Sequence, residues 1–293
     1  MRVTVRVPAT SANLGPGFDC FGLALDLCNE VVLDTDAPPG VTWEGEGEDE
    51  LPRDGSDLVS RTIAGVASGM ELALPPFGLN GENRIPLERG LGSSSAATVA
   101  GVVLASRLLD LGIDGFREEP ERRDPYSVFA YASRFEGHPD NAAPAAYGGF
   151  TIALPDGGVH RLDPHPDLRP VVLVPDVRLP TTEARAALPQ TVARADAVFN
   201  AAHAALMVEA LTRDPSLLVV ALQDRLHQEA RLALVPEVAD VFDDLRAAHV
   251  PVCVSGAGPS LLAFDLGAGT FPSTPPGWRE LRPGVRAAGF EVV

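Results

Sequence analysis

Hydrophobic residues recur along the chain at two spacings, and these spacings predict short strands and longer helices. Val3, Val5 and Val7 alternate with polar side chains, as in a strand with one buried face. Strand-like runs lie at 3–7, 31–35, 41–44, 150–154, 171–175, 252–255 and 261–265. Helical runs lie at 57–70, 94–111, 125–135, 193–210, 217–222 and 235–248. Because strands and helices mix without regular alternation, we expect an α+β fold in two layers rather than a Rossmann sheet.

Charged stretches and turn-rich stretches separate these runs. Residues 44–57 and 117–124 are dense in charge and are expected to be solvated loops. A Gly-Gly pair and several prolines interrupt the pattern within 156–167, so we place a boundary there between an N-terminal domain, 1–160, and a C-terminal domain, 161–293. No apolar stretch approaches the length of a membrane span, and the first residues do not resemble a signal peptide. We therefore expect a cytoplasmic protein with no membrane partner.

The composition narrows the possible chemistry. The 293 residues carry 40 acidic and 23 basic side chains, a formal net charge of −17, which opposes binding to nucleic acid or to an anionic membrane. All 23 basic residues are arginine, so the chain has no Walker-A lysine, no protein-kinase ion-pair lysine and no Schiff-base lysine. Cys20, Cys28 and Cys253 follow no metal-ligand spacing and are expected to be reduced and mostly buried.

The run GLGSSSAA at 90–97 leads a glycine-serine turn directly into an apolar helix. Glycine permits backbone conformations in which main-chain N–H groups approach an anion closely, and the positive end of the helix dipole favours a phosphate there. We expect the serines to cap this helix. The candidate phosphate-binding residues are Gly90, Leu91, Gly92, Ser93, Ser94, Ser95 and Ala96. The alternative is a structural turn whose glycines pack against a strand.

Three other motifs accompany this loop: PATSANLGPGFD at 8–19, EGHPDNAAP at 136–144 and VSGAGPS at 254–260. Together the four motifs resemble those of the GHMP small-molecule kinases, and PATSANLGPGFD resembles the homoserine kinase family in particular, over residues 1 to about 265. The resemblance implies a ribosomal-protein-S5-like N-terminal domain and a ferredoxin-like α/β-plait C-terminal domain. It also implies use of ATP and Mg²⁺ to convert L-homoserine to O-phospho-L-homoserine on the route to threonine, and a homodimer.

The resemblance assigns a metal site to two oxygen-bearing side chains. Ser94 and Glu136 are the expected Mg²⁺ ligands, and Mg²⁺ commonly takes only one or two ligands from protein. For Glu136, an ordinary carboxylate at the end of a surface helix is the alternative.

The expected acceptor, homoserine, carries an ammonium, a carboxylate and a hydroxyl group, and each needs a different partner. By the resemblance, Asp19 binds the ammonium, with Asn13 hydrogen-bonding nearby. Arg185 and Arg231 bind the carboxylate, for which forked guanidinium groups are well suited. An Asx turn at Asn13 and ordinary surface charges at the two arginines are the alternatives.

The EGHPDNAAP motif supplies the candidates for positioning the hydroxyl. Chemistry alone suggests His138 as a general base oriented by Asp140. The resemblance implies instead that Asn141 positions the hydroxyl and that His138 contacts the substrate, without a dedicated carboxylate base. A structural role is then the alternative for Asp140. The expected catalytic set is therefore Asn141, His138, Glu136 and Ser94.

Two regions depart from the family pattern. The tail at 267–283 is short and rich in Pro and Gly, whereas the family is expected to have a longer final helix at this end. The adenine pocket is poorly marked, with Asn80 and Asn83 as candidates. Two other functions stay open: a kinase of the same family that acts on another small hydroxylated acceptor, and a non-catalytic sensor of a nucleotide or an amino acid. The joint retention of metal-binding and hydroxyl-positioning residues argues against the sensor.

Overall fold

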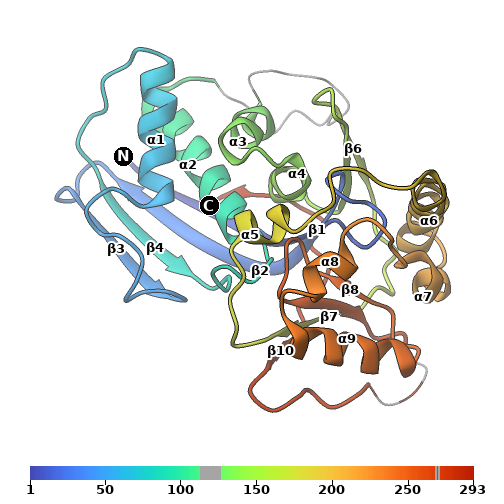
Figure 1. Cartoon of the computed structure of the whole chain (residues 1–293). Helices are drawn as coiled ribbons and strands as arrows, with labels where there is room; N and C mark the ends of the chain where they lie inside the picture. Colours follow the sequence, from blue (N-terminus) through green and yellow to red (C-terminus); the bar gives the residue numbers. More distant parts are fainter. Residues whose placement is uncertain (113–126, 268, 270) are drawn as a thin grey trace.

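The computed structural model describes residues 1–112, 127–267, 269 and 271–293, and it contains two sheets (Figure 1). The first sheet runs in the order β11-β1-β2-β4-β3, and β5 joins it by pairing with β2 and β6. All of its pairings are antiparallel except that of β3 with β4. Its strands are β1 (Arg2–Ala12), β2 (Phe21–Asp34), β3 (Gly40–Gly45), β4 (Gly78–Asn83), β5 (Phe150–Ala153), β6 (Val159–Leu162) and β11 (Glu291–Val292).

Four helices cover one face of the first sheet (Figure 1). They are α1 (Leu58–Gly69), α2 (Ser93–Leu109), α3 (Val128–Glu136) and α4 (Pro139–Tyr147). The central helix α2 packs against α1, α3, α4 and β1, and its apolar residues are buried on nearly all sides, as with Val99, Val102 and Leu104. The start of α2 lies beside the end of β1, where the Thr10 N–H donates to the Leu91 carbonyl at 3.0 Å.

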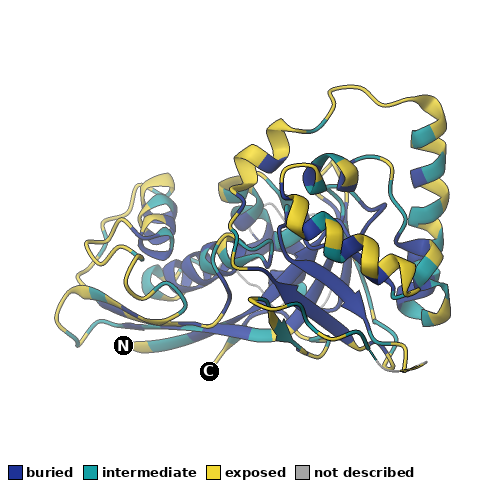
Figure 2. Ribbon diagram, turned by 60° about the horizontal axis from the view of Figure 1, so that its bottom comes forward, coloured by how far each residue is buried: buried dark blue, intermediate teal, exposed yellow. Residues whose placement is uncertain are grey.

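The second sheet is antiparallel and runs in the order β10-β7-β9-β8. Its strands are β7 (Pro170–Val174), β8 (Val252–Val254), β9 (Leu261–Phe264) and β10 (Arg279–Leu281). The helices of this half are α5 (Thr181–Ala186), α6 (Arg194–Thr212), α7 (Leu218–Ala221), α8 (Gln228–Leu232) and α9 (Pro236–Ala247). Phe242 and Leu245 of α9 pack on Val171, Leu173 and other strand residues in a second core. Figure 2 shows buried strands, while α6 and α9 expose their outer sides.

The first sheet with α1–α4 forms one half of the molecule, and the second sheet with α5–α9 forms the other. The end of the chain and the segment around the GLGSSSAA loop connect them. β11 pairs with β1, and Val285 bridges to Leu25 of β2. Directly before this loop, the Arg89 side chain donates to the main-chain carbonyls of Pro175 and Asp176, just after β7. These contacts hold the loop at the junction of the two sheets.

The prediction of an α+β fold in layers is confirmed, whereas several elements differ from the sequence-based expectation. The run predicted at 3–7 is part of the longer β1, and that predicted at 31–35 is the end of the longer β2 except for its last residue. The strand β4 was not predicted, because its sequence GLNGEN is poor in residues with high β-propensity. The short helices α4, α5 and α8 were not predicted either, since α4 contains two prolines and the other two span only six and five residues.

Other expectations concern loops and ends. Of the loop predicted at 44–57, residues 44 and 45 end β3 and residues 46–57 lie outside helices and strands. The Asp57 side chain accepts from the backbone N–H of Ser60 to cap α1. The boundary predicted at 160/161 falls within β6, and the tail that departs from the family pattern contains β10. The predicted loop at 117–124 and the start of the helix predicted at 125–135 lie outside the described residues. Across the part of the chain that is described, no helix combines the length and the apolar character needed to span a bilayer.

Candidate active site

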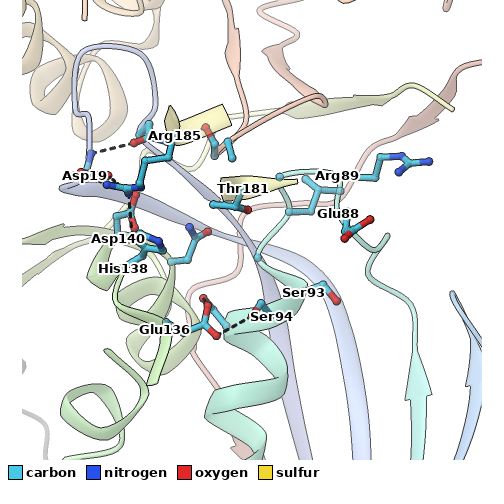
Figure 3. Close-up of a pocket in the computed structure, with 18 of the residues that line it drawn as sticks. Asp19, Glu88, Arg89, Ser93, Ser94, Glu136, His138, Asp140, Thr181 and Arg185 are labelled. Atoms are coloured by element: carbon cyan, nitrogen blue, oxygen red, sulfur yellow. Dashed lines mark hydrogen bonds and ion pairs between the residues drawn. The ribbon is translucent and has the colours of Figure 1, made fainter. Parts of the chain in front are cut away.

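A pocket opens at the junction of the two halves, and residues from segments far apart in the sequence line it (Figure 3). Its volume is about 160 Å³. The second half contributes Thr181, Arg185, Arg231, Gly256 and Ala257. The first half contributes Asn13 and Asp19 of the β1–β2 loop, Pro86, residues 88–95, Glu136, His138, Asp140 and Asn141. All the site residues predicted for the acceptor and the metal line this one pocket.

The two glycines of the GLGSSSAA loop lie where a side chain cannot fit. Gly92 is the N-cap of α2 with φ +68°, and a Cβ there would lie 1.9 Å from Thr10 Oγ1. Gly90 has φ +70°, and its Cβ would lie 2.1 Å from the carbonyl oxygen of Ser255. The loop therefore depends on glycine both for its backbone conformation and for close packing.

The serines do not cap α2, contrary to expectation. The N-cap is Gly92, and it makes no side-chain cap bond. The hydroxyls of Ser94 and Ser95 donate instead to the Glu136 carboxylate, at 2.8 and 2.9 Å. Because the serine side chains turn toward Glu136, the N–H groups of the first turn stay available for an anion.

Glu136, the last residue of α3, gathers three hydroxyl groups from α2. Besides Ser94 and Ser95, the buried Thr98 donates to Glu136 Oε1 at 2.7 Å. Figure 3 shows Glu136 directed at the start of α2. A carboxylate with neighbouring hydroxyls is an all-oxygen donor set that suits Mg²⁺ completed by phosphate and water. Among the described residues, no group of three or more His, Cys, Asp or Glu side chains is placed so that it could hold a metal ion.

An ion pair and a histidine lie at the other end of the pocket (Figure 3). Arg185 donates to both oxygens of Asp19, at 2.8 and 3.2 Å, and its Nη2 also contacts His138 Nδ1 at 2.9 Å. Since arginine can only donate, His138 must accept at Nδ1 and is neutral in this contact. Burial and the nearby Arg185 cation lower the pKa of His138 accordingly.

Arg231 is a buried cation that faces the pocket. Its guanidinium donates to His227 Nδ1 at 2.9 Å and to the Gly256 carbonyl at 2.7 Å, while its Nε has no partner. Among the described residues, Arg231 forms no ion pair with a carboxylate within 4.0 Å. Burial lowers the pKa of Arg231 to about 10. A buried cation without a carboxylate partner is costly unless an anion binds beside it.

The two asparagines of the predicted site are held by hydrogen bonds. Asn13 donates to the Gly256 carbonyl and accepts from the Asp19 N–H, at 2.8 and 2.9 Å, so it orders the loop that carries Asp19. Asn141 accepts from the Thr10 hydroxyl at 2.8 Å. The Asn13 contacts are those of the structural alternative raised from the sequence, in which its side chain shapes the glycine-rich loop.

Comparison with known proteins identifies the family. Residues 57–149 match the family described as GHMP kinases N terminal domain. The chain is 44% identical over 273 residues to homoserine kinase of Streptomyces avermitilis, covering 89% of this chain and 85% of that protein. It is 41% identical to homoserine kinase of Rhodococcus erythropolis, covering 100% of this chain and 93% of that protein. The chain belongs to the homoserine kinase family.

Solved structures agree with this placement in the homoserine kinase family. The crystal structure of homoserine kinase from Cytophaga hutchinsonii matches with a TM-score of 0.79 and 28% identity, covering 100% of this chain and 97% of that one. Mevalonate kinase of L. major, at 14% identity and a TM-score of 0.66, shares the fold alone. The predictions of family and of a GHMP-kinase fold are confirmed.

In this member of the homoserine kinase family, Asp140 is a buried carboxyl group in the wall of the pocket. It is 4% exposed, and its Oδ1 has no hydrogen-bond partner. Burial, reinforced by the Asp19 carboxylate, raises the pKa of Asp140 to about 7. The folded protein therefore retains this proton from the ordinary pKa of 3.8 up to about 7, while the unfolded chain releases it.

Asp140→Asn is consequently expected to stabilise the protein increasingly as the pH rises from about 4 to 7, and by a constant amount above pH 7. Over this range the carboxyl group ionises in the unfolded chain but not in the folded protein, which favours unfolding of the wild type, whereas the amide ionises in neither state. We expect a gain on the order of 2 kcal/mol at pH 8, read from urea denaturation at several pH values. Asp240→Asn, on the exposed face of α9, is the matched control and should change stability little at any pH. A gain of equal size at every pH would exclude the proposed ionisation.

Several residues of the site were not singled out from the sequence. Thr10 and Thr98 hold Asn141 and Glu136, and His227 holds Arg231. Thr10 lies within PATSANLGPGFD, and His227 lies four positions before Arg231, but neither position indicated the partner of its side chain. The adenine candidates lie elsewhere: Asn83 donates to the Glu46 carbonyl, Asn80 accepts from Thr42, and neither lines the pocket in Figure 3. Cys28 and Cys253 are buried and Cys20 is half-buried, and all three are free.

Proposed function

We propose that this chain transfers the γ-phosphate of ATP to the side-chain hydroxyl of L-homoserine and forms O-phospho-L-homoserine, a step toward threonine. The proposal rests on one observation: a single pocket has one end that suits an amino acid and another that suits phosphate. One end has a carboxylate and two arginines that complement an amino acid, and the other has a helix N-terminus that suits phosphate. Homoserine places its hydroxyl between them.

At the amino-acid end, the ammonium of homoserine binds Asp19 and its carboxylate binds Arg185 and Arg231. Asp19 and Arg185 already form an ion pair, so they present opposite charges side by side, as a zwitterion requires. Arg231 adds the buried positive charge. Asn13 contributes by fixing the loop of Asp19 and by lining the same wall.

At the phosphate end, the backbone of residues 90–96 holds the triphosphate. The first-turn N–H groups and the dipole of α2 supply positive potential where an overall acidic chain otherwise repels ATP. Ser94 and Glu136 are suited to hold Mg²⁺, which supplies charge neutralisation on the phosphates.

Asn141 and His138 position the attacking hydroxyl. Thr10 fixes the Asn141 amide, and the Asn141 side chain lies close to Gly92 at the start of α2. His138 is held by Arg185 through Nδ1, so a proton added at that nitrogen would break the contact. These contacts favour catalysis by positioning over general-base catalysis, which suits phosphoryl transfer because it asks for little covalent chemistry from the protein.

We extend the proposal to the organisation of the protein. The domain at 1–160 supplies the phosphate loop and the metal ligands, and the domain at 161–293 supplies the two arginines. The protein acts in the cytoplasm as a homodimer, as the family resemblance implies.

The test is ADP release by the purified protein with ATP and Mg²⁺ and a panel of acceptors. We expect turnover with L-homoserine and background rates with mevalonate, galactose or no acceptor. Faster turnover of another acceptor would assign the protein to a different GHMP kinase activity. Binding of ATP and homoserine without turnover would favour a sensor.

A further inference from the structure

We propose that His227 is a positioning residue that holds the Arg231 guanidinium in the pocket, and that it does so only as a neutral ring protonated at Nε2. The inference deepens the proposed function, because it concerns how the carboxylate-binding arginine is held. His227 does not line the pocket itself, and it acts through Arg231.

The hydrogen bonds of His227 determine its protonation state. Its Nε2 lies 2.8 Å from the carbonyl oxygen of Gly15, which can only accept, so Nε2 carries a proton. Its Nδ1 lies 2.9 Å from Arg231 Nη1, which can only donate, so Nδ1 carries none. A second proton on the ring would place two donors, both positively charged, against each other.

The surroundings of His227 support the neutral state. The ring is 1% exposed and packs on Phe18 at a centroid distance of 5.3 Å, and the Arg231 guanidinium also lies over Phe18. The charged groups around the ring are Arg231 of α8, Asp224 before α8 and Asp19 of the β1–β2 loop. Burial and Arg231 lower the pKa of His227 to about 4, although the two carboxylates act in the opposite direction.

Asp224 does not accept a hydrogen bond from the His227 ring, as the carboxylate of a catalytic dyad would. Its Oδ2 lies 3.9 Å from His227 Nε2. That oxygen accepts from the backbone N–H groups of His227 and Gln228, and Oδ1 accepts from Asn200. The Nε2 proton is therefore directed to Gly15, and His227 connects the loop that carries Asp19 to the arginine on α8.

The kinetic test compares three substitutions. His227→Phe keeps the ring beside Phe18 but removes both nitrogens, and His227→Asn keeps an oxygen acceptor near the Nδ1 position. We expect His227→Phe to raise the KM for homoserine about tenfold, as for one lost charge-assisted hydrogen bond, while the KM for ATP stays within about twofold. His227→Asn should recover part of the loss. The control His203→Phe, at a half-buried histidine of α6 that stacks on Phe199, should leave both KM values unchanged. Equal effects on both substrates, or no recovery in His227→Asn, would overturn the proposal.

A second measurement needs neither turnover nor substrate. Nitrogen NMR of the histidine rings, assigned by the signal lost in His227→Phe or His227→Asn, reports the tautomer directly. We expect a neutral ring protonated at Nε2 that does not titrate above about pH 5, and a rise in its pKa in Arg231→Met. An Nδ1-protonated ring, or titration near 6.5, would overturn the proposal. If wild-type protein failed to phosphorylate homoserine, the proposed function would fall while the NMR result still tested the contact.

Discussion

Arg231→Met is expected to raise the KM for homoserine by a factor between about 30 and several thousand, with a smaller fall in kcat. Removing one partner of a buried charge pair costs about 2 to 5 kcal/mol, and each 1.4 kcal/mol corresponds to about tenfold in affinity. Methionine keeps much of the side-chain volume and removes the charge that faces the pocket. Steady-state kinetics with each substrate varied in turn separates this effect from any change in ATP binding.

Three variants serve as references for Arg231→Met. Arg246→Met removes an exposed arginine of α9 and should leave the KM for homoserine unchanged. Arg185→Met should raise this KM less, because Arg185 is about two-fifths exposed and its charge is screened by water. Asn141→Ala should lower kcat instead, since it orients the reacting oxygen. An unaltered KM for homoserine in a folded Arg231→Met protein would show that the carboxylate of homoserine does not bind at this end of the pocket.

Gly92→Ala is expected to lower kcat/KM for ATP by about a hundredfold or more while the protein still folds. The left-handed backbone costs alanine about 1 to 2 kcal/mol, which a stable fold tolerates. The functional loss is larger, because the new Cβ would lie 1.9 Å from Thr10 Oγ1 and 3.2 Å from Asn141 Oδ1. To relieve the clash, the start of α2 or the Thr10–Asn141 pair must move, and a displacement of about 1 Å at a reacting centre can cost about a hundredfold.

Gly55→Ala is the matched control for this substitution. Gly55 has φ +85°, so alanine meets the same kind of backbone strain, but no atom lies within 4 Å of its added Cβ. It should lose stability and retain ATP binding. Calorimetric titration with ATP and thermal melting of both variants make the comparison. Similar ATP affinities in Gly92→Ala and wild type would show that the loop is a structural turn and does not bind phosphate.

The sequence could predict the start of α2 because the evidence for it is local. A glycine-serine turn followed by an apolar helical run is visible within a few residues, and the remaining motifs indicate which residue types meet in the pocket. It could not predict the contacts between segments far apart in the chain. Thr10 meets Asn141 and Arg185 meets Asp19 only after the two halves pack together.

Local patterns also account for the misassigned elements. The serines of the loop looked like helix caps because Ser is a common N-cap residue. Glu136 competes for their hydroxyls, and it lies 42 positions from Ser94. The strand β4 has few β-formers, and it is a strand because β2 and β3 pair with it on either side. In each case, tertiary pairing overrides a local propensity.

Asp19 is proposed to bind the ammonium of homoserine, and Arg231 its carboxylate. The most direct test measures kcat/KM for L-homoserine, for 4-hydroxybutanoate, which lacks the ammonium, and for 2-amino-1,4-butanediol, which lacks the carboxylate. Wild-type protein should prefer homoserine over each analogue by about a hundredfold or more. Asp19→Asn should lose mainly its preference over 4-hydroxybutanoate, and Arg231→Met should lose mainly its preference over the diol. If both variants kept the wild-type preferences and lost activity equally on all three compounds, the assignment of these two residues would be contradicted.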